Sequence, residues 1–425
     1  MSDKKHKKIL ILFALVFIFA VVTKLTRLST PKDFYFDEVY HAYTATLYLH
    51  GDKEAYNPYA KAPEGKAVEW THPPLSKLIM AGTMKVFGEN SFGWRIGSVI
   101  FGTAAIVATA VLAYTLFHSL TIALLSMLLM SLETLVLAQS RVAMNDSYFV
   151  FFMLIGLISY VHFKREPSRL KPLYLTGIAL GLSLATKWTA LYIFVIIALD
   201  LTRDLVWKGR WPKGASFLHM VVALALLPAL IYIASYAQFF ILGWGWEDLG
   251  KLQSQMWNYH NNLTATHSYS SKPWQWLLNI RPVWMYVDYS VPDKIGNIYN
   301  LGNSVILFAG LYAVFATLFR EKSGTGTWEK WFILLIYFAL WMPWIVSPRI
   351  MLFYHYMPAI PALCIITARW LDQMLHAAQP RRHMIAKAVL VGAFVWFVLF
   401  YPHITAIRVP KGFADAVYFL IPSWK

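Results

Sequence analysis

The sequence has little charge, a single cysteine and none of the familiar nucleotide- or metal-binding motifs. Only 14% of its 425 residues are charged, whereas an average soluble domain has about 25%. Cys364 lies inside an apolar run, so a disulfide framework and a thiolate metal site are both excluded. No GxGxxG, P-loop, HExxH or GxSxG stands in a fitting context, which disfavours nucleotide-dependent chemistry.

Apolar residues, in contrast, make up 58% of the chain and aromatic residues 16%. This composition is typical of a polytopic membrane protein. The formal net charge of +16 comes largely from short Lys and Arg clusters between apolar runs. Clusters in those places orient a membrane protein, so no nucleic-acid partner is predicted.

A helix needs about 20 mostly apolar residues to cross the hydrocarbon layer. About eleven runs qualify or come close, and the first has the basic flank of a signal peptide but no small-residue cleavage site, so it is expected to remain as an uncleaved span. The predicted spans are 9–23, 94–117, 119–138, 148–163, 172–187, 188–201, 217–240, 301–319, 331–346, 355–371 and 385–401.

The loops between these spans separate by charge. If the lysines of MSDKKHKK keep the N-terminus cytoplasmic, the basic loops 164–171, 202–214, 320–330 and 379–383 fall on the same side, as the positive-inside rule requires. The opposite, extracytoplasmic side receives two long loops, 24–93 and 241–300, and the turn at 139–147, Lys187, segment 347–356 and the tail from 402. The charged residues that topology does not explain therefore gather on one face of a plasma-membrane protein.

The two long external loops are expected to carry function, because simple connections are much shorter. In YFDEVYHAYTATLYL, two sets of positions at helical spacing predict a helix on the membrane surface: Tyr40, Tyr43 and Leu47, and Val39, Ala42 and Thr46. In HPPLSKLIMAGTMKVF, prolines at a helix entrance followed by apolar residues predict a second one.

Asp37 and Glu38 set two carboxylates side by side among aromatics just after the first span. Neighbouring helix positions point about 100° apart, so the two cannot share one proton as a facing pair would. One would act as acid or base and the other as its orienter or ion-pair partner. A solvated helix start, where Asp and Glu are favoured by the helix dipole, is the alternative.

Several cations occur on the external face. His72 and Lys77 flank two prolines, and Arg95, Arg141, Lys187 and Arg349 fall at span ends, with Asp146 beside Arg141 in one turn. Each alone is explained as an anchor or an ion-pair member. Together they suit a phosphate carried on a lipid, which Arg binds bidentately and Lys binds as a point charge.

Segment 257–276 mixes polar and aromatic residues, which either hold a sugar or cover a pocket mouth; Trp274 and Trp276 are its candidates for sugar or acceptor contact, with Asp146. His260 and His267, seven residues apart, could share a helix face and are further candidates for sugar or acceptor contact. No third ligand stands at metal spacing, so no zinc site is predicted.

The chain resembles a known family, the bacterial protein O-mannosyltransferases that use polyprenyl- or dolichyl-phosphate mannose. The resemblance rests on eight stretches in the family's order, from about residue 34 to 365: FDEVYHAYTA, THPPLSKL, ENSFGWR, QSRVAMNDSYFVFF, ATKWTALY, SYSSKPWQWLLNIRPVWMY, NLGNSVILF and PRIMLFYHYMPAIP. It implies an all-α membrane protein of the GT-C glycosyltransferase fold, one domain over residues 1–425, with about eleven transmembrane helices, external amphipathic helices and extracytoplasmic catalysis.

Position by position, the resemblance implies that Asp37 is the catalytic base and Glu38 its essential neighbour. It also implies that Arg95 and Arg141 are functional arginines and that His72 and Lys77 line the lipid-phosphate site. Lys187, Arg349, Tyr354 and His355 are added to the donor-phosphate residues, although their motifs also fit a packing role.

One departure limits what the resemblance implies. Loop 241–300 is too short for the β-trefoil domain that the eukaryotic enzymes insert there. The expected reaction is inverting transfer of mannose from a polyprenyl-phosphate donor, which is a substrate and not a cofactor, to Ser or Thr of secreted or membrane proteins, at the membrane or the translocon. A glycolipid acceptor of the lipid A type, or a lipid-linked sugar flippase without chemistry, remain the alternatives.

Overall fold

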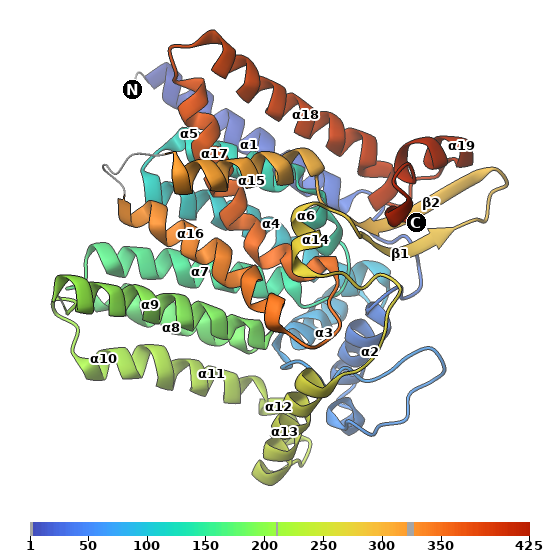
Figure 1. Cartoon of the computed structure of the whole chain (residues 1–425). Coiled ribbons are helices and arrows are strands. Elements are labelled where there is room, and N and C mark those ends of the chain that lie inside the picture. Colours follow the sequence, from blue (N-terminus) through green and yellow to red (C-terminus); the bar gives the residue numbers. More distant parts are fainter. Residues whose placement is uncertain (1–2, 210, 321–326) are drawn as a thin grey trace. The chain divides into compact units, whose positions relative to one another are not determined.

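In the computed structural model, which describes residues 3–209, 211–320 and 327–425, the apolar runs of the sequence form helices (Figure 1). All eleven predicted spans coincide with helical segments. Of the four basic loops, 320–330 lies mostly outside the described residues, and 202–214 includes Arg210, which lies outside them too. The chain divides into two compact units, each described by itself here.

The first unit comprises Met1–Thr30, Gly102–Arg141 and Thr266–Lys425. Helix α5 packs against α1 and α17, α17 packs against α15, α16 and α18, and α6 packs against strand β2. Its elements are α1 (Asp3–Leu25), α5 (Leu120–Leu132), α6 (Thr134–Gln139), α14 (Pro273–Leu277), β1 (Val283–Asp288), β2 (Lys294–Asn300), α15 (Ser304–Phe319), α16 (Thr327–Trp341), η4 (Met342–Val346), η5 (Phe353–Ala359), α17 (Ile360–Leu375), α18 (Pro380–Ile404), β3 (Val409–Pro410), α19 (Lys411–Phe413), η6 (Ala414–Tyr418) and η7 (Pro422–Trp424).

The second unit comprises Pro31–Phe101 and Val142–Ala265. Helix α2 packs on α3, and α8 packs on α7 and α11. Its elements are α2 (Glu38–Leu49), η1 (Lys53–Tyr56), α3 (Leu75–Phe87), α7 (Asp146–Arg165), α8 (Leu170–Leu184), η2 (Trp188–Ala190), α9 (Leu191–Lys208), α10 (Phe217–Val221), η3 (Val222–Leu226), α11 (Leu227–Ser235), α12 (Ala237–Ile241) and α13 (Trp246–Asn262). Helix α4 (Ser91–Phe117) begins in this unit and ends in the first.

Six helices of the described chain are long and apolar enough to cross a membrane: Lys7–Leu25, Ser91–Phe117, Asp146–Arg165, Phe217–Ser235, Thr327–Val346 and Pro380–Ile404. Helices α5, α8 and α15 are apolar but shorter. The predicted span 119–138 is interrupted because Glu133 ends α5 and caps α6, its carboxylate accepting a hydrogen bond from Leu135 N at 3.2 Å. The prediction of a polytopic helical membrane protein is confirmed.

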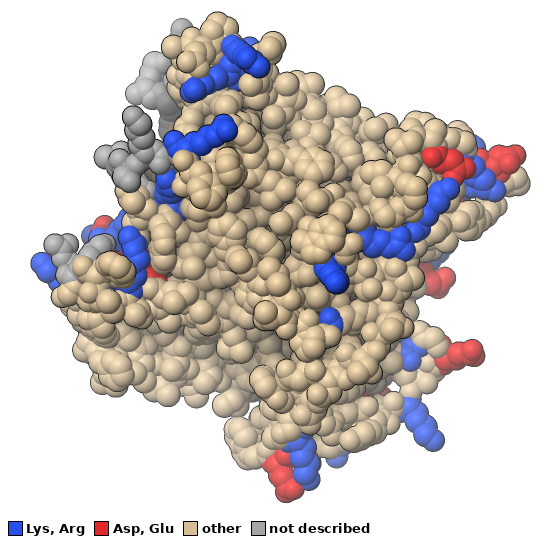
Figure 2. All heavy atoms as spheres, viewed as in Figure 1, with Lys and Arg blue, Asp and Glu red and all other residues tan. Residues whose placement is uncertain are grey.

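Apolar side chains cover the outside of these helices, as a lipid environment requires. In the second unit, the visible surface over the middle of α8 and α11 carries almost no charge, and coloured side chains gather where α9 gives way to α10 and over α13 (Figure 2). Charge thus marks the ends of the long helices, as the loop pattern predicts.

Loop 241–300 holds more regular structure than the sequence indicated. It contains helices α13 and α14 and the hairpin β1–β2, which extends to a three-stranded sheet in the order β1-β2-β3. Strands β1 and β2 are antiparallel, with Val283 opposite Asn300 and an irregularity between Trp284 and Tyr286. The sheet was not predicted, because KIGNIYN shows no clean alternation of apolar and polar residues.

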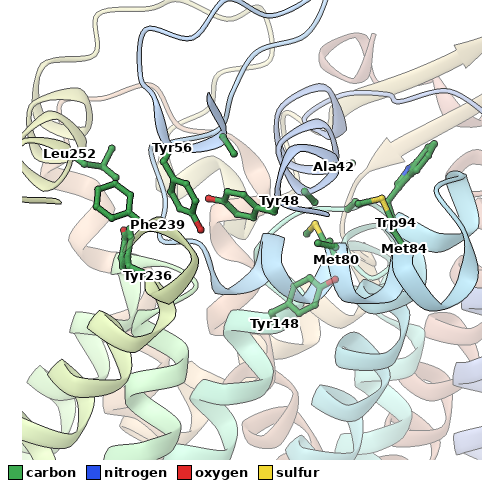
Figure 3. Packing of buried hydrophobic residues seen from close by; sticks show 14 of the residues in the cluster. Ala42, Tyr48, Tyr56, Met80, Met84, Trp94, Tyr148, Tyr236, Phe239 and Leu252 are labelled. Atoms are coloured by element: carbon green, nitrogen blue, oxygen red, sulfur yellow. The ribbon is translucent and has the colours of Figure 1, made fainter. Parts of the chain in front are cut away.

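Helices exist at both predicted positions, and of the residues named for the apolar side of the first, Ala42 is buried and Tyr40 is exposed. Helix α2 buries Ala42, Ala45 and Tyr48, while Tyr40 is 43% exposed. These residues join a cluster with Met80 and Met84 of α3, and Tyr48 stacks on Tyr56 at 4.7 Å (Figure 3). The small side chains Ala42 and Ala45 allow the close approach of α2 to α3, so α2 is a packed element of the second unit.

Candidate active site

Asp37 and Glu38 lie in the first turn of α2, and the residue before them, Phe36, has a strained backbone conformation. Phe36 has φ +50°, a left-handed conformation that is uncommon for a bulky side chain. The turn is closed by hydrogen bonds from Glu38 N to Tyr35 O and from His41 N to Asp37 O. Asp37 is the N-cap residue and is half-buried. Strain of this kind is commonly kept where geometry matters for function.

Glu38 is fully buried and is held by an arginine from α4. Its Oε1 lies 2.7 Å from Arg95 Nε and its Oε2 lies 2.8 Å from Arg95 Nη2. Trp94 Nε1 and Ala143 N donate to the same carboxylate at 3.3 and 3.1 Å. Arg95 uses its remaining donors on the carbonyls of Pro31 and Asp33. The ion pair therefore fixes the segment that carries Asp37 against α4 and the turn before α7.

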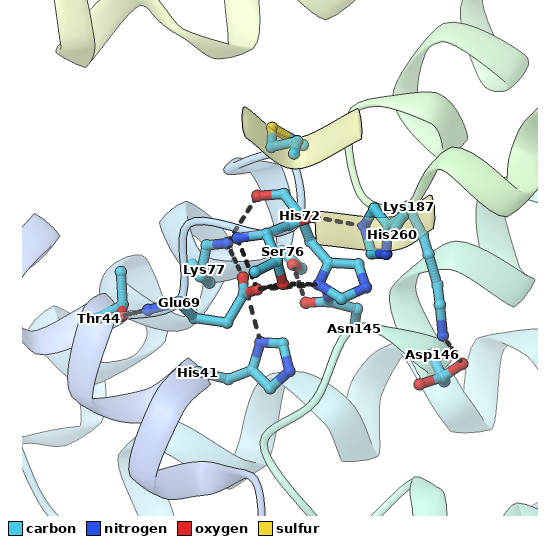
Figure 4. A network of polar contacts seen from close by, with 12 residues as sticks. His41, Thr44, Glu69, His72, Ser76, Lys77, Asn145, Asp146, Lys187 and His260 are labelled. Atoms are coloured by element: carbon cyan, nitrogen blue, oxygen red, sulfur yellow. Dashed lines mark hydrogen bonds and ion pairs between the residues drawn. The ribbon is translucent and has the colours of Figure 1, made fainter. Parts of the chain in front are cut away.

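A second buried acid, Glu69, lies at the centre of a polar cluster on α2, α3 and the loop between them (Figure 4). Its Oε1 accepts from Thr71 N at 3.0 Å and from His72 Nδ1 at 2.9 Å, and its Oε2 pairs with Lys77 Nζ. Lys77 Nζ also donates to His72 O at 2.9 Å, and His41 Nδ1 is 3.8 Å from Oε2. Lys77 is therefore already paired with a carboxylate of this chain, that of Glu69.

Burial decides the protonation states in this cluster. It lowers the pKa of His41 to about 4 and that of His72 to about 3, although Glu69 favours their charged forms. Burial also opposes ionisation of Glu69, but Lys77 and His72 outweigh it and hold the pKa of Glu69 well below its usual value. Burial lowers the pKa of Lys77, and Glu69 opposes that change. At neutral pH the cluster therefore holds one acid–base ion pair and two neutral imidazoles.

Two further contacts join this region to α7 and η2. Ser76 Oγ donates to Asn145 Oδ1 at 2.6 Å, and Lys187 Nζ lies 2.8 Å from Asp146 Oδ1. Both Asp146 and Lys187 are buried. His260, from the end of α13, donates through Nε2 to Thr71 O at 2.8 Å, and its ring centre lies 5.3 Å from that of His72. The predicted residues Asp37, Glu38, His72, Lys77, Arg95, Asp146, Lys187 and His260 all belong to the second unit.

The other predicted residues belong to the first unit. Arg141 is buried and donates to the carbonyls of Lys24, Thr26 and Arg27, where α1 ends. A cation is favourable at the C-terminal end of a helix. Arg349 is half-buried between η4 and η5.

The aromatic candidates of this unit form a stack. Trp276 is fully buried, its ring nearly parallel to that of His355 at 6.2 Å, and its Nε1 donates to Ser271 Oγ at 2.9 Å. Tyr354 stacks on His355 at 4.7 Å. Trp274, in contrast, is 53% exposed. Of the two tryptophans, only Trp274 presents an open ring to the surroundings.

One sequence expectation is wrong. Helix α13 ends at Asn262, so His260 and His267 do not share a helix face. The helix ends here because the segment that follows is rich in serine and threonine, whose side chains compete for backbone hydrogen bonds. His267 makes a contact of the same kind, since its Nδ1 accepts a hydrogen bond from Tyr269 N. His267 is exposed. Within the described ranges no three His, Cys, Asp or Glu side chains are grouped so as to hold a metal ion.

Sequence reasoning missed Glu69 and His41. Each had a local signal: Glu69 precedes His72 by three residues, and His41 follows Glu38 by three on the same helix. Spacing of this kind is common, however, and only the burial of the two side chains makes them stand out.

Comparison with known proteins matches nearly the whole chain to two adjoining family models. The model described as "Dolichyl-phosphate-mannose-protein mannosyltransferase" covers residues 14–242, and the one described as "C-terminal four TMM region of protein-O-mannosyltransferase" covers residues 245–420. The chain belongs to the protein O-mannosyltransferase family. The resemblance noted in the sequence is therefore confirmed.

Bacterial members of the family align with almost the full chain. The polyprenol-phosphate-mannose–protein mannosyltransferases of Mycolicibacterium smegmatis and Corynebacterium glutamicum are each 24% identical to it, over 97% of this chain and 92% and 93% of theirs. Among solved structures, the Saccharomyces cerevisiae Pmt1–Pmt2 complex bound to the sugar donor matches with a TM-score of 0.79 at 14% identity, covering 96% of this chain and 92% of that one. ArnT from Cupriavidus metallidurans bound to undecaprenyl phosphate matches at 0.60 and 14% identity, over 97% and 73%. The fold is that of the GT-C glycosyltransferases, as predicted.

Proposed function

We propose that this O-mannosyltransferase family member transfers mannose, with inversion, from a polyprenyl-phosphate mannose to Ser or Thr hydroxyls of secreted or membrane proteins, met at the membrane or the translocon. The observation that carries the proposal is the family match over residues 14–242 and 245–420, together with a half-buried carboxylate, Asp37, set beside a locked Glu38–Arg95 pair.

In the proposed reaction, Asp37 accepts the proton of the acceptor hydroxyl as its oxygen attacks the anomeric carbon. The bond from that carbon to the phosphate oxygen breaks, and the lipid phosphate leaves with the electron pair. A carboxylate is a weak base but ionised at neutral pH, which suffices when proton transfer is late. Glu38, Arg95 and Arg141 are proposed as positioning residues, because their side chains are enclosed.

Cations stabilise the leaving phosphate more in the transition state than in the ground state, because negative charge grows on it as the bond breaks. We assign this role to Lys187 and Arg349. Lys77 is paired with Glu69, and it would act on the phosphate through its electrostatic field. Tyr354 and His355 also stay predictions for contact with the donor phosphate. Asp146, His260, His267, Trp274 and Trp276 remain proposals for sugar or acceptor contact, with Trp274 the most accessible of them.

We also propose that the N-terminus is cytoplasmic and the site extracytoplasmic, in the plasma membrane. Helix α7 supports this assignment, because Asp146 begins it near the cluster and Arg165 ends it at a basic loop. Its 20 residues span about 30 Å, the thickness of the hydrocarbon layer. A helix of this length supports the proposal that the site and the basic loop lie at opposite membrane surfaces.

The test is a membrane assay with radiolabelled polyprenyl-phosphate mannose and a Ser/Thr-rich peptide, comparing the natural chain with Asp37→Asn at matched expression. Label on the peptide with the natural chain and none with Asp37→Asn supports the proposal. Donor consumed without peptide labelling would favour a glycolipid acceptor, and label crossing the bilayer without transfer would favour a flippase. The glycolipid outcome is included because of one similarity. The Pseudomonas aeruginosa undecaprenyl phosphate-alpha-4-amino-4-deoxy-L-arabinose arabinosyl transferase is 30% identical over 230 residues, which is 50% of this chain and 40% of that one.

A further inference from the structure

The contacts of Glu69 fix which nitrogen of His72 carries the proton. Lys77 Nζ pairs with one oxygen of the carboxylate, and Thr71 N and His72 Nδ1 lie 3.0 and 2.9 Å from the other. An ionised carboxylate only accepts hydrogen bonds, and the Thr71 hydroxyl, 3.0 Å from Nδ1, donates its own proton to the same carboxylate, so Nδ1 must donate. A neutral imidazole has one N–H, and therefore His72 Nε2 keeps a lone pair.

That lone pair is on the more open part of the cluster. The His72 side chain is 20% exposed, whereas Glu69 is 6% and Lys77 is 0% exposed. Among the described residues, no hydrogen bond to His72 Nε2 is recorded, while His260 beside it already uses its Nε2–H on Thr71 O. An accessible nitrogen without a proton accepts a hydrogen bond and repels a phosphate oxygen, which is also an acceptor. The geometry thus argues against the phosphate role that the sequence predicted for His72.

We propose that His72 Nε2 accepts a hydrogen bond from a substrate hydroxyl, and that Glu69 is the positioning residue which fixes His72 in the Nδ1–H tautomer. The proposal rests on the mannosyl-transfer function given above. The hydroxyl belongs either to the mannose of the donor or to the Ser or Thr of the acceptor; the chemistry at Nε2 is the same. The rings of His260 and Trp188, 5.9 Å apart, add an aromatic wall next to His72 of the kind that packs on a sugar's C–H face.

Glu69→Gln tests this assignment because it changes the proton pattern and keeps the side-chain shape. It also leaves the buried Lys77 cation without its carboxylate, so unfolding is measured on the same preparation as transfer. The amide oxygen is expected to face the Lys77 ammonium, because a charged donor outweighs the neutral Thr71 N–H that loses its acceptor, and the NH2 then faces His72 Nδ1. Nδ1 becomes an acceptor, and the proton moves to Nε2. The accessible nitrogen loses its lone pair, and the substrate hydroxyl loses its acceptor.

The first measurement is steady-state transfer by the full-length chain in liposomes, varying donor and peptide separately. Glu69→Gln and His72→Phe are each expected to raise one KM about tenfold, the cost of one hydrogen bond of about 1.4 kcal/mol, with a smaller change in kcat. A higher KM for the donor assigns the hydroxyl to mannose, and a higher KM for the peptide assigns it to the acceptor. The double variant is expected to match His72→Phe for this KM, because Glu69 acts on it through His72.

Glu64→Gln, an exposed glutamate of the same loop, is the matched control and should leave both KM values unchanged. Glu69→Asp keeps the charge and should recover part of the loss. Both KM values within twofold of the natural chain in Glu69→Gln would overturn the proposal, as would additive effects in the double variant.

The second measurement does not depend on activity. In ¹⁵N-histidine NMR of the chain in bilayers, the signals that disappear in His72→Phe should show a protonated Nδ1 and a bare Nε2, and Glu69→Gln should exchange them. A bare Nδ1 in the natural chain would overturn the proposal even if transfer were normal. If the natural chain transfers no mannose to peptide, the proposed function fails, and the NMR result alone decides whether Glu69 sets the tautomer.

Discussion

Glu38 and Arg95 meet through two nearly parallel hydrogen bonds, 2.7 Å from Oε1 to Nε and 2.8 Å from Oε2 to Nη2, with both side chains fully buried. A buried pair of this kind contributes less by its own attraction than by what its loss leaves behind, namely a charge without a partner in a medium of low dielectric constant. The pair also explains why two adjacent carboxylates can have separate tasks. Glu38 is fully buried and paired with Arg95, whereas Asp37 is half-buried and lies nearer to the surface.

Glu38→Gln is expected to lower the free energy of unfolding by about 3–5 kcal/mol, because Arg95 is left as an uncompensated buried cation. Thermal unfolding in detergent measures the loss. Glu89→Gln is the control, since Glu89 pairs with His50 at the surface and exposed pairs contribute about 0–1 kcal/mol. Equal losses for the two variants would contradict the buried-pair argument. Glu38→Gln combined with Arg95→Gln should lose less than the two single variants summed.

Asp37→Asn is expected to reduce mannosyl transfer by about 10²–10⁴-fold, the range of a general base, without lowering stability. Asp and Asn are equally good N-cap residues, and the Asp37 side chain makes no capping hydrogen bond. Transfer and unfolding should be measured on the same preparation. Asp33→Asn, an exposed change in the same loop, should leave both unaltered. Retained transfer in Asp37→Asn would remove the proposed base.

Lys187 and Asp146 allow a test that separates structure from catalysis. Their charged atoms are 2.8 Å apart and both side chains are buried. Lys187→Met leaves a buried carboxylate unpaired and should lower both stability and transfer. Adding Asp146→Asn removes that charge, so stability should recover. Because Asp146 is itself proposed to contact sugar or acceptor, the reference is Asp146→Asn alone, and transfer by the double variant should lie below that reference if Lys187 acts on the donor phosphate. Recovery of transfer together with stability would show that the lysine is needed only for folding.

The stability of the second unit should depend on pH through His41. Its pKa falls from 6.5 to about 4 on burial, so between these values the unfolded chain binds more protons and stability decreases as the pH falls. His41 contributes a slope of about 1.4 kcal/mol per pH unit in that window. Unfolding midpoints in detergent from pH 7.5 to 5 measure it. His72, whose pKa falls to about 3, contributes in the same window, so His41→Asn should reduce the slope of these two histidines by about half. His50→Asn, at the exposed end of the same helix, should not change it. An unchanged slope in His41→Asn would exclude His41 as the cause.

Sequence patterns predicted the helices well because a membrane span needs a long apolar run whatever it packs against. Residues 94–117 and 385–401 are such runs, and α4 and α18 extend them by a few residues. The amphipathic spacing after Asp37 likewise predicted α2. The residues named for its apolar side included Ala42, which is buried, and Tyr40, which is exposed, because α2 packs through the small residues Ala42 and Ala45.

The pairing of charges inside the site was beyond sequence reasoning. Glu38 and Arg95 are 57 residues apart and Lys187 and Asp146 are 41 apart, so their contact depends on how the helices pack. Lys77 was expected to bind a substrate anion, and the cluster instead supplies Glu69, eight residues earlier, as its partner. Residue types at a helix entrance predict that a cation is present, whereas its partner is decided by tertiary structure.

Gly177 and Gly181, four residues apart on α8, allow a close approach that a side chain would prevent. A Cβ on Gly177 would lie 1.8 Å from Ala223 O, and one on Gly181 would lie 2.9 Å from Pro228 Cα. Small residues at this spacing are typical of tightly packed membrane helices. Gly177→Ala should therefore destabilise the protein by about 1–3 kcal/mol through overpacking, although alanine favours a helix by about 1 kcal/mol. Gly250→Ala on α13, where nothing lies within 4 Å of the new Cβ, is the matched control and should be neutral or stabilising. Thermal unfolding of both variants decides the matter, since equal midpoints would show that α8 and η3 do not pack this closely.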